Sequence, residues 1–255
     1  MIVPLLLFAV VAGDTVLERF PAPAGTARVD VVAGSFGAYL RALPLKPAGT
    51  PVLAFDGRTI DAPWAKAVVD VDVGSKDLQQ CADSAIRLYA EHRRAQNDVD
   101  GLSFHATSGD PLPWKRYAAG ERPSAPKNKV IWSKKAAPSS SAATFRSWLD
   151  AVFLWAGSRS LALDTVAVDT LAPGDLLVVG GSPGHVLVVL DVATATAGGK
   201  PQLLIGQGYM PAQSFHVIGW TGVDDDGSVT VPSWPAPFPR EGHRRFRSTS
   251  RPPRP

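Results

Sequence analysis

The sequence predicts an α+β fold in which an antiparallel sheet packs against a few helices. Segments 77–95 and 142–157 carry apolar residues three and four positions apart, the spacing of amphipathic helices. Four short apolar runs follow between residues 173 and 220, separated by turn residues, as expected for consecutive antiparallel strands. Helices followed by a run of strands are typical of the α+β class.

Length and composition favour one domain. The chain has 255 residues, of which 45% are apolar, enough for a substantial core, and we expect a single α+β domain over residues 25–232. The net charge of +3 is misleading, because residues 240–255 hold six arginines and one glutamate, a local +5 that leaves about −2 for the rest (3 − 5). Without a basic face, nucleic acid is not an expected partner.

Both ends of the chain differ from the middle. Residues 1–13, "MIVPLLLFAVVAG", are too short to span a bilayer and end in small residues before Asp14, which favours a signal peptide and an extracytoplasmic protein, periplasmic or secreted. No lysine or arginine precedes Leu5, so a misassigned start or a buried strand is the alternative. The mature chain is expected to have no membrane span. Residues 233–255 are rich in proline and arginine and are expected to be disordered.

The first elements follow from turn and stop signals. "SFGAYLRALPLKP" predicts a short helix stopped by Pro44. "PVLAFDGRTI" predicts a hairpin with Asp56 and Gly57 at the centre of a type I′ turn. Strict alternation in "AVVDVDVG", residues 67–74, predicts a half-buried strand.

The two helices frame a less regular region. In "KDLQQCADSAIRLYAEHRRA" the pair Asp77 and Gln80 forms a capping box, which places Cys81 in the first turn or just past it. A short strand is expected around "LSFHAT", and the Pro/Ser/Lys-rich segment 122–141 is expected to be a mobile loop. The second helix is expected to bury five apolar side chains: Phe145, Trp148, Leu149, Val152 and Phe153.

Three residues could together perform acyl transfer by a thiol. Cys81 is expected near a helix N-terminus, whose partial positive charge lowers a thiol pKa. His185 begins the apolar strand of "GGSPGHVLVVLD", and Gln207 in the next strand could orient its ring. Each residue also has an ordinary structural interpretation: a core cysteine, a turn histidine satisfied by backbone, and a glutamine bonded within its own sheet.

Other chemistries find no pattern in the sequence. His92, His105, His185 and His216 form no local ligand pair, and a single cysteine excludes Cys-rich zinc sites, so neither a metal nor a cofactor is expected. That cysteine also has no partner for an internal disulfide. There is no GxSxG serine motif and no phosphate-binding loop.

Several stretches resemble a bacterial family known only as a domain of unknown function, DUF4846. The resemblance rests on "SFGAYLRALPLKP", "DLQQCADSAIRLYAEHRR", "GGSPGHVLVVLDVA" and "QGYMPAQSFHVI", which occur in the expected order and cover most of residues 30–220. The family name implies no activity. The resemblance places Cys81, His185, Gln207 and the stretch from Tyr209 to Gln213 inside family motifs.

The order cysteine, histidine, polar residue is also similar to the papain-like superfamily, especially its NlpC-type and CHAP-type cell-wall amidases and endopeptidases. That similarity implies a papain-like antiparallel sheet packed on a helix that bears Cys81. It makes Cys81 the nucleophile, His185 the general base and Gln207 the orienting group, where the superfamily usually has Asn, His or Asp. It also implies a secreted thiol hydrolase acting on amide bonds, with peptidoglycan peptide as the substrate.

A second interpretation remains open: a secreted binding or structural module of the same fold without catalysis. The loop "GQGYMPAQ" would then be a contact surface. Tyr209, Met210 and Gln213 in this loop are the expected substrate-binding residues of the hydrolase, and Tyr209 and Met210 would equally suit a binding surface.

Overall fold

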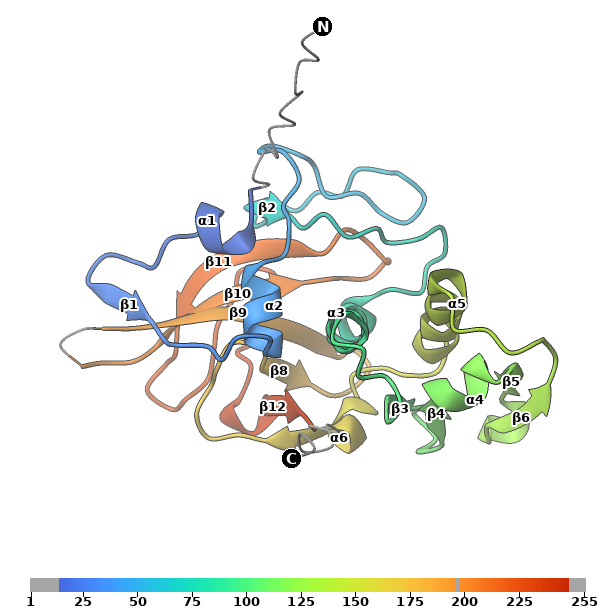
Figure 1. Cartoon of the computed structure of the whole chain (residues 1–255). Helices are drawn as coiled ribbons and strands as arrows, with labels where there is room; N and C mark the ends of the chain where they lie inside the picture. The colour runs from blue at the N-terminus through green and yellow to red at the C-terminus, as the bar shows by residue number, and fades with distance from the viewer. Residues whose placement is uncertain (1–13, 196–197, 248–255) are drawn as a thin grey trace, which may run out of the picture.

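A computed structural model describes residues 14–195 and 198–247. Its main feature is an eight-stranded sheet with the order β2-β11-β10-β9-β8-β12-β7, and β1 pairs with the far end of β9 (Figure 1). The expected antiparallel series of four strands is present as the consecutive neighbours β8, β9, β10 and β11. The strands of this sheet are β1 Thr26–Arg28, β2 Ala67–Val68, β7 Thr165–Ala167, β8 Leu176–Val179, β9 His185–Ala195, β10 Gln202–Gln207, β11 His216–Gly222 and β12 His243–Phe246.

Helices cover one face of this sheet. Figure 1 shows α2 and α3 lying against β9, with α5 next to α3. All five side chains expected to be buried by the second long helix are buried on α5. The α+β class predicted from the sequence is therefore present. The helices are α1 Val16–Arg19, α2 Phe36–Arg41, α3 Cys81–Ala95, α4 Trp114–Ala118, α5 Ala142–Phe153 and α6 Leu161–Asp164.

The central strand β9 is buried on both faces, which explains its uninterrupted apolar run. Because side chains alternate along a strand, Val186 and Val188 face the core shared with the helices, whereas Leu187 and Val189 face a second core. This second core is closed by residues after β11, among them Phe238, which has no exposed surface. The sheet is thus the middle layer of three.

The C-terminal segment differs from its expected disorder. Residues 233–247 are part of the domain: β12 lies between β7 and β8, and Phe238 and Phe246 are buried. Arg245 forms an ion pair with the buried Asp175, at 2.6 Å between Nε and Oδ1. Composition alone missed this, because a short strand can order a polar segment when two neighbouring strands offer unpaired backbone groups. Residues 248–255 of the expected tail, and the expected signal peptide 1–13, lie outside the described residues.

The segment expected to be a mobile loop contains a hairpin. Strands β5 Glu121–Ser124 and β6 Ile131–Lys134 pair around the 3₁₀ turn Pro126–Asn128, beside the small hairpin of β3 Ser103–His105 and β4 Pro111–Pro113. The Arg116 guanidinium lies over the Trp132 ring, 5.0 Å from its centre, and helps to hold the hairpin against α4.

Two early predictions were only partly right. Of the strand expected over residues 67–74, only β2 is formed as a strand, and Val69 continues it by a single bridge to Leu45. The chain then turns so that Asp72 reaches Arg87 on α3. In the hairpin, the Gly57 amide donates to the Ala54 carbonyl, so Gly57 follows the turn with φ of 86° and is not at its centre.

Within the part of the chain that the structure describes, no helix combines the length and apolar content needed to cross a membrane.

Candidate functional site

His185 and Gln207 are brought together as the sequence predicted. His185 is the first residue of β9 and Gln207 the last of β10, and the antiparallel pairing sets these two ends side by side. The His185 Nε2 atom lies 2.7 Å from the Gln207 Oε1 atom, and both side chains are buried.

The hydrogen bonds around Gln207 continue to two residues that the sequence analysis did not single out for the site. Gln207 Nε2 lies 3.1 Å from His216 Nε2, and His216 Nδ1 lies 3.0 Å from the carbonyl oxygen of Ser214. Ser233 Oγ donates to Gln207 Oε1 at 3.0 Å. No sequence motif marks His216 or Ser233. His216 could have been found from its position in β11, the strand that pairs with Gln207.

This chain of bonds assigns the protons. A carbonyl oxygen only accepts, so His216 carries its proton on Nδ1 and its Nε2 is the acceptor for the Gln207 amide. The Gln207 oxygen therefore points to His185, whose Nε2 must be the protonated nitrogen. The other nitrogen of His185, Nδ1, is left with its lone pair, and no hydrogen bond to it is formed by the described residues. Nδ1 is thus the nitrogen of His185 that can accept a proton.

Aromatic side chains hold the His185 ring in place. The Trp234 ring stacks on it with centres 4.8 Å apart and planes 16° apart, and the Tyr209 ring is tilted against it at 4.7 Å. Trp234 and Ser233 lie just beyond residue 232, where the sequence analysis ended the domain. The segment that was expected to be disordered therefore completes the surroundings of His185.

Cys81 is the first residue of α3 and lies on the helix side of the sheet, partly buried against the core of that side. The backbone amides of Val186 and Ala82 act on its sulfur and lower the pKa of the thiol, an effect smaller than that of burial. His185 shares its strand face with Leu187 and so belongs to the opposite layer. Cys81 and His185 therefore lie on opposite sides of β9, and among the described residues no hydrogen bond links the thiol to the ring.

Two glycines next to Gln207 and His185 are in close contact with neighbouring segments. A Cβ atom on Gly208, directly after Gln207, would lie 2.2 Å from Ser84 Oγ and 3.0 Å from the Gln80 carbonyl, so only glycine lets β10 end against the first turn of α3. A Cβ on Gly184, directly before His185, would lie 2.4 Å from Ser158 Oγ.

The N-terminus of α3 differs in detail from its prediction. Gln80 is the N-cap residue, and the Asp83 carboxylate accepts the Gln80 amide at 3.1 Å. Asp77 has another role: its Oδ1 accepts the Ala212 amide at 2.7 Å and so fixes the loop after Gln207 to the start of the helix. This loop contains a cis peptide bond between Met210 and Pro211, and the loop before His185 contains one between Ser182 and Pro183.

The pKa values of the two candidate catalytic groups move apart. Burial raises the pKa of the Cys81 thiol to about 11, the nearby Asp83 carboxylate adds to the rise, and the Val186 and Ala82 amides only partly offset it. Burial lowers the pKa of His185 to about 4. The expectation that the helix terminus lowers the thiol pKa is thus wrong, because the cost of desolvating a thiolate is larger than the effect of the free amides. Near neutral pH both groups are uncharged.

Cys81 lines a cleft of about 530 Å³. Its walls come from the start of α3, from residues 153–159 after α5, and from the turn 181–184 before β9. Met210 lines it and is 64% exposed, whereas Tyr209 lies behind it against His185. Gln213 does not line the cleft and is only 2% exposed, so the expectation that it contacts substrate is not supported. A second hollow of about 580 Å³ shares Asp77, Leu78 and Leu154 with the first, so the cleft continues beyond Cys81.

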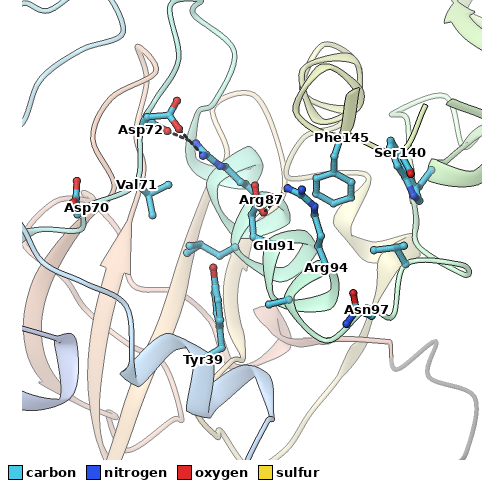
Figure 2. Close-up of a pocket in the computed structure, with 14 residues that line it drawn as sticks. Tyr39, Asp70, Val71, Asp72, Arg87, Glu91, Arg94, Asn97, Ser140 and Phe145 are labelled. Atoms are coloured by element: carbon cyan, nitrogen blue, oxygen red, sulfur yellow. Dashed lines mark hydrogen bonds and ion pairs between the residues drawn. The ribbon is translucent and has the colours of Figure 1, made fainter. Parts of the chain in front are cut away.

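A larger cavity, of about 780 Å³, lies along the other part of α3. Figure 2 shows Arg87 pointing to Asp72, with 2.8 Å between Nη2 and Oδ2, and Arg94 beside the Phe145 ring. The lining of this larger cavity contains no cysteine and no histidine. The arginines of this cavity are engaged with residues of its own wall, so we place the candidate chemistry at Cys81. Among residues 14–195 and 198–247, no group of three or more side chains suited to a metal ion was found.

The family model described as a domain of unknown function (4846) matches residues 16–235. The chain belongs to this family. No curated protein and no solved structure matches the chain. The matched region contains Cys81, His185, Gln207, His216, Ser233 and Trp234 and ends before β12, which the structure nevertheless places within the sheet.

Proposed function

We propose that this domain is a thiol hydrolase of amide bonds with a papain-like arrangement of its site. Cys81 is the nucleophile, His185 the general base and Gln207 the group that orients the base. The proposal rests on one observation above all: the hydrogen bonds from Ser214 through His216 and Gln207 leave Nδ1 of His185 as a free acceptor. His185 directly precedes Val186, whose backbone amide lowers the pKa of the Cys81 thiol.

The reaction requires only water besides the substrate. The Cys81 sulfur attacks the amide carbonyl carbon while its proton passes to Nδ1 of His185. The carbon–nitrogen bond then breaks, the leaving nitrogen takes that proton, and a thioester remains on Cys81. Water attacks the thioester, with His185 again accepting a proton, and release of the carboxylic acid restores the thiol.

The pKa values favour concerted proton transfer over a stored ion pair. Since the thiol has a pKa of about 11 and His185 of about 4, the resting site holds a neutral thiol and a neutral imidazole. The base is therefore available through the neutral pH range, and the thiolate forms only as attack proceeds. Buried Gln207 supports the imidazolium that develops, since its oxygen accepts from Nε2.

The substrate and the location are proposed by resemblance. A cleft that continues past Cys81 into a second hollow suits a chain-like amide, and peptidoglycan peptide is the candidate that the papain-like resemblance suggests. Such a substrate would require export of the protein from the cytoplasm. Met210 at the edge of the cleft and Tyr209 behind it are the residues of this loop placed to affect binding.

A non-catalytic binding module is the second candidate, and one observation favours it. Met210 and Leu154 line the same cleft and are 64% and 58% exposed, an apolar pair that a bound partner could cover. The neutral thiol would then be a wall of the cleft and not a reactant.

Acylation by an activated ester separates the two candidates. We expect p-nitrophenyl acetate to place an acetyl group on Cys81, as measured by mass spectrometry of the folded protein. The Cys81→Ala variant should not be labelled in this position, and His185→Ala should slow labelling by about 100-fold or more, the usual contribution of a positioned base.

His105→Ala is the matched control, because His105 pairs with Asp164 away from the cleft. Its labelling rate should equal that of the unmodified protein. Equal rates in His185→Ala and the unmodified protein would rule out the hydrolase and leave the binding module.

A further inference from the structure

Arg159 is a cation that lines the Cys81 cleft. It lies in the segment between α5 and α6, lines the cleft together with Cys81, and is exposed. Within the described part of the chain its guanidinium forms no ion pair or hydrogen bond. Most other arginines of the domain are paired, as Arg28 and Arg41 are with Asp191.

Two serine hydroxyl groups belong to residues that also line the cleft. Ser158 precedes Arg159 and is packed against Gly184, and Ser182 lies in the turn before His185. Neither hydroxyl forms a hydrogen bond with the described residues, so both remain available to a ligand. A guanidinium and two hydroxyl donors match the acceptor oxygens of a carboxylate, which arginine can bind through two parallel bonds.

The acidic residues of the cleft do not neutralise this cation. The Asp77 Oδ1 accepts the Ala212 amide, and Asp77 also borders the second hollow. Asp83 is 5% exposed, and its Oδ2 accepts the Gln80 amide. Neither carboxylate forms an ion pair with Arg159 within the part of the chain that the structure describes.

We propose that Arg159, Ser158 and Ser182 form a carboxylate-binding subsite, and that the substrate is an amide with a free carboxylate next to the bond that is cleaved. The inference rests on the proposed function, since it assigns a substrate class to the same cleft. It orients the substrate as well: the carboxylate lies toward the turn 181–184, and the remainder extends past Leu154 into the second hollow.

A pair of alkylating reagents tests the subsite without knowledge of the substrate. Iodoacetate and iodoacetamide differ only in carrying a carboxylate or a neutral amide, and both modify a reachable thiol. We expect Arg159→Gln to lower the rate of Cys81 with iodoacetate by about two- to fivefold, the range of an exposed ion pair, and to leave the rate with iodoacetamide unchanged. Arg159→Lys should restore part of the preference, and high salt should weaken it in the unmodified protein.

Arg240→Gln is the matched control, because Arg240 is an exposed arginine that pairs with Asp169 and does not line the cleft. Its ratio of the two rates should equal that of the unmodified protein. If both reagents modify Cys81 but Arg159→Gln leaves their ratio unchanged, the subsite is wrong and the proposed hydrolase stands. A folded protein in which neither reagent modifies Cys81 would overturn the proposed function, and the subsite with it.

Discussion

The Cys81 thiol and the Asp83 carboxyl are two residues apart in the first turn of α3 and share one cleft. Asp83 holds the N-cap amide through Oδ2, whereas its Oδ1 is buried without a hydrogen-bond partner. An acid in this position raises the pKa of the thiol, after the larger effect of burial. The same carboxyl thus supports the helix terminus and opposes ionisation of the Cys81 thiol.

Replacing Asp83 should separate these two effects. We expect Asp83→Asn to lower the pKa of Cys81 while leaving it above that of a free thiol, because desolvation by burial persists. The measurement is the rate of iodoacetamide modification against pH, with folding monitored by circular dichroism.

Glu91→Gln is the control, since it removes a carboxylate farther along the same helix. Its profile should match that of the unmodified protein. If the Cys81 thiol of the unmodified protein had a pKa below the value of a free thiol, about 8.5, burial would not be the main influence on it.

Strand β12 is the element that the sequence least indicated. Its four residues pair with β8 on one side and β7 on the other, and Phe246 stacks on Tyr89 of α3 with ring centres 4.3 Å apart. The residues just before it, Ser233, Trp234 and Phe238, pack around Gln207 and His185. The C-terminal segment therefore stabilises both the sheet and the candidate base.

Truncation after Pro239 should destabilise the protein. The truncation removes β12 and uncovers the side chains against which Phe246 packs. We expect the free energy of unfolding to fall by about 3 kcal/mol, from the lost burial of one large apolar side chain and the lost strand pairing. For a domain of this size that corresponds to a fall of roughly 6–12 °C in Tm, measured by differential scanning calorimetry.

Truncation after Arg247 is the comparison, because it retains every interaction of β12 described above. If the protein truncated after Pro239 had an unchanged Tm, β12 would contribute nothing to the stability of the fold.

At the scale of the whole molecule, three buried histidines make the protein sensitive to acid. His185, His216 and His243 are each at most 3% exposed, and burial lowers the pKa of all three. Both ring nitrogens of His243 are buried and have no hydrogen-bond partner among the described residues. The unfolded chain binds protons on these residues at a higher pH than the folded chain, so acidification favours unfolding.

We expect the free energy of unfolding to fall as the pH drops below about 6.5, the value for an unfolded histidine. The loss from His185 continues until its folded pKa of about 4 and amounts to something on the order of 3 kcal/mol. Asp83 and Asp164, whose pKa values are raised by burial, instead stabilise the folded protein on acidification. The contribution of His185 is therefore measured as the difference in stability between the unmodified protein and a variant that lacks this histidine.

Urea denaturation of the unmodified protein and of His185→Phe across this range provides that difference. Phenylalanine can stack on Trp234 but does not titrate, so the unmodified protein should lose stability more steeply between about pH 6.5 and pH 4. Parallel curves for the two proteins would contradict a depressed pKa at His185.

The sequence predicted the parts of the fold that repeat a regular spacing. Apolar periodicity predicted the buried face of α5, the burial of β9 on both faces and the four consecutive strands. Because β9 and β10 are consecutive and antiparallel, the start of β9 was also expected beside the end of β10. Periodicity also located Cys81, His185 and Gln207. It could not show that the Cys81 and His185 side chains lie on opposite faces of the sheet. Side chains alternate along a strand, and packing decides which of the two sets faces the helices.

Residues whose role depends on distant partners were missed for the same reason. His216 bonds Gln207 across a strand pair, and Ser233 and Trp234 reach His185 from a segment whose composition indicated disorder. The pKa of Cys81 was predicted in the wrong direction, because a helix terminus is visible in sequence and the burial of its first side chain is not.

The position of β12 in the sheet also bears on how the protein is made. The chain is synthesised from its N-terminus, and the strand between β7 and β8 is encoded after both of them, at residues 243–246. Until those residues leave the ribosome, β8 has an open edge with unpaired backbone groups, a surface that promotes association between nascent chains. Folding of the sheet can therefore finish only after residues 243–246 have left the ribosome, however early β7 and β8 are synthesised.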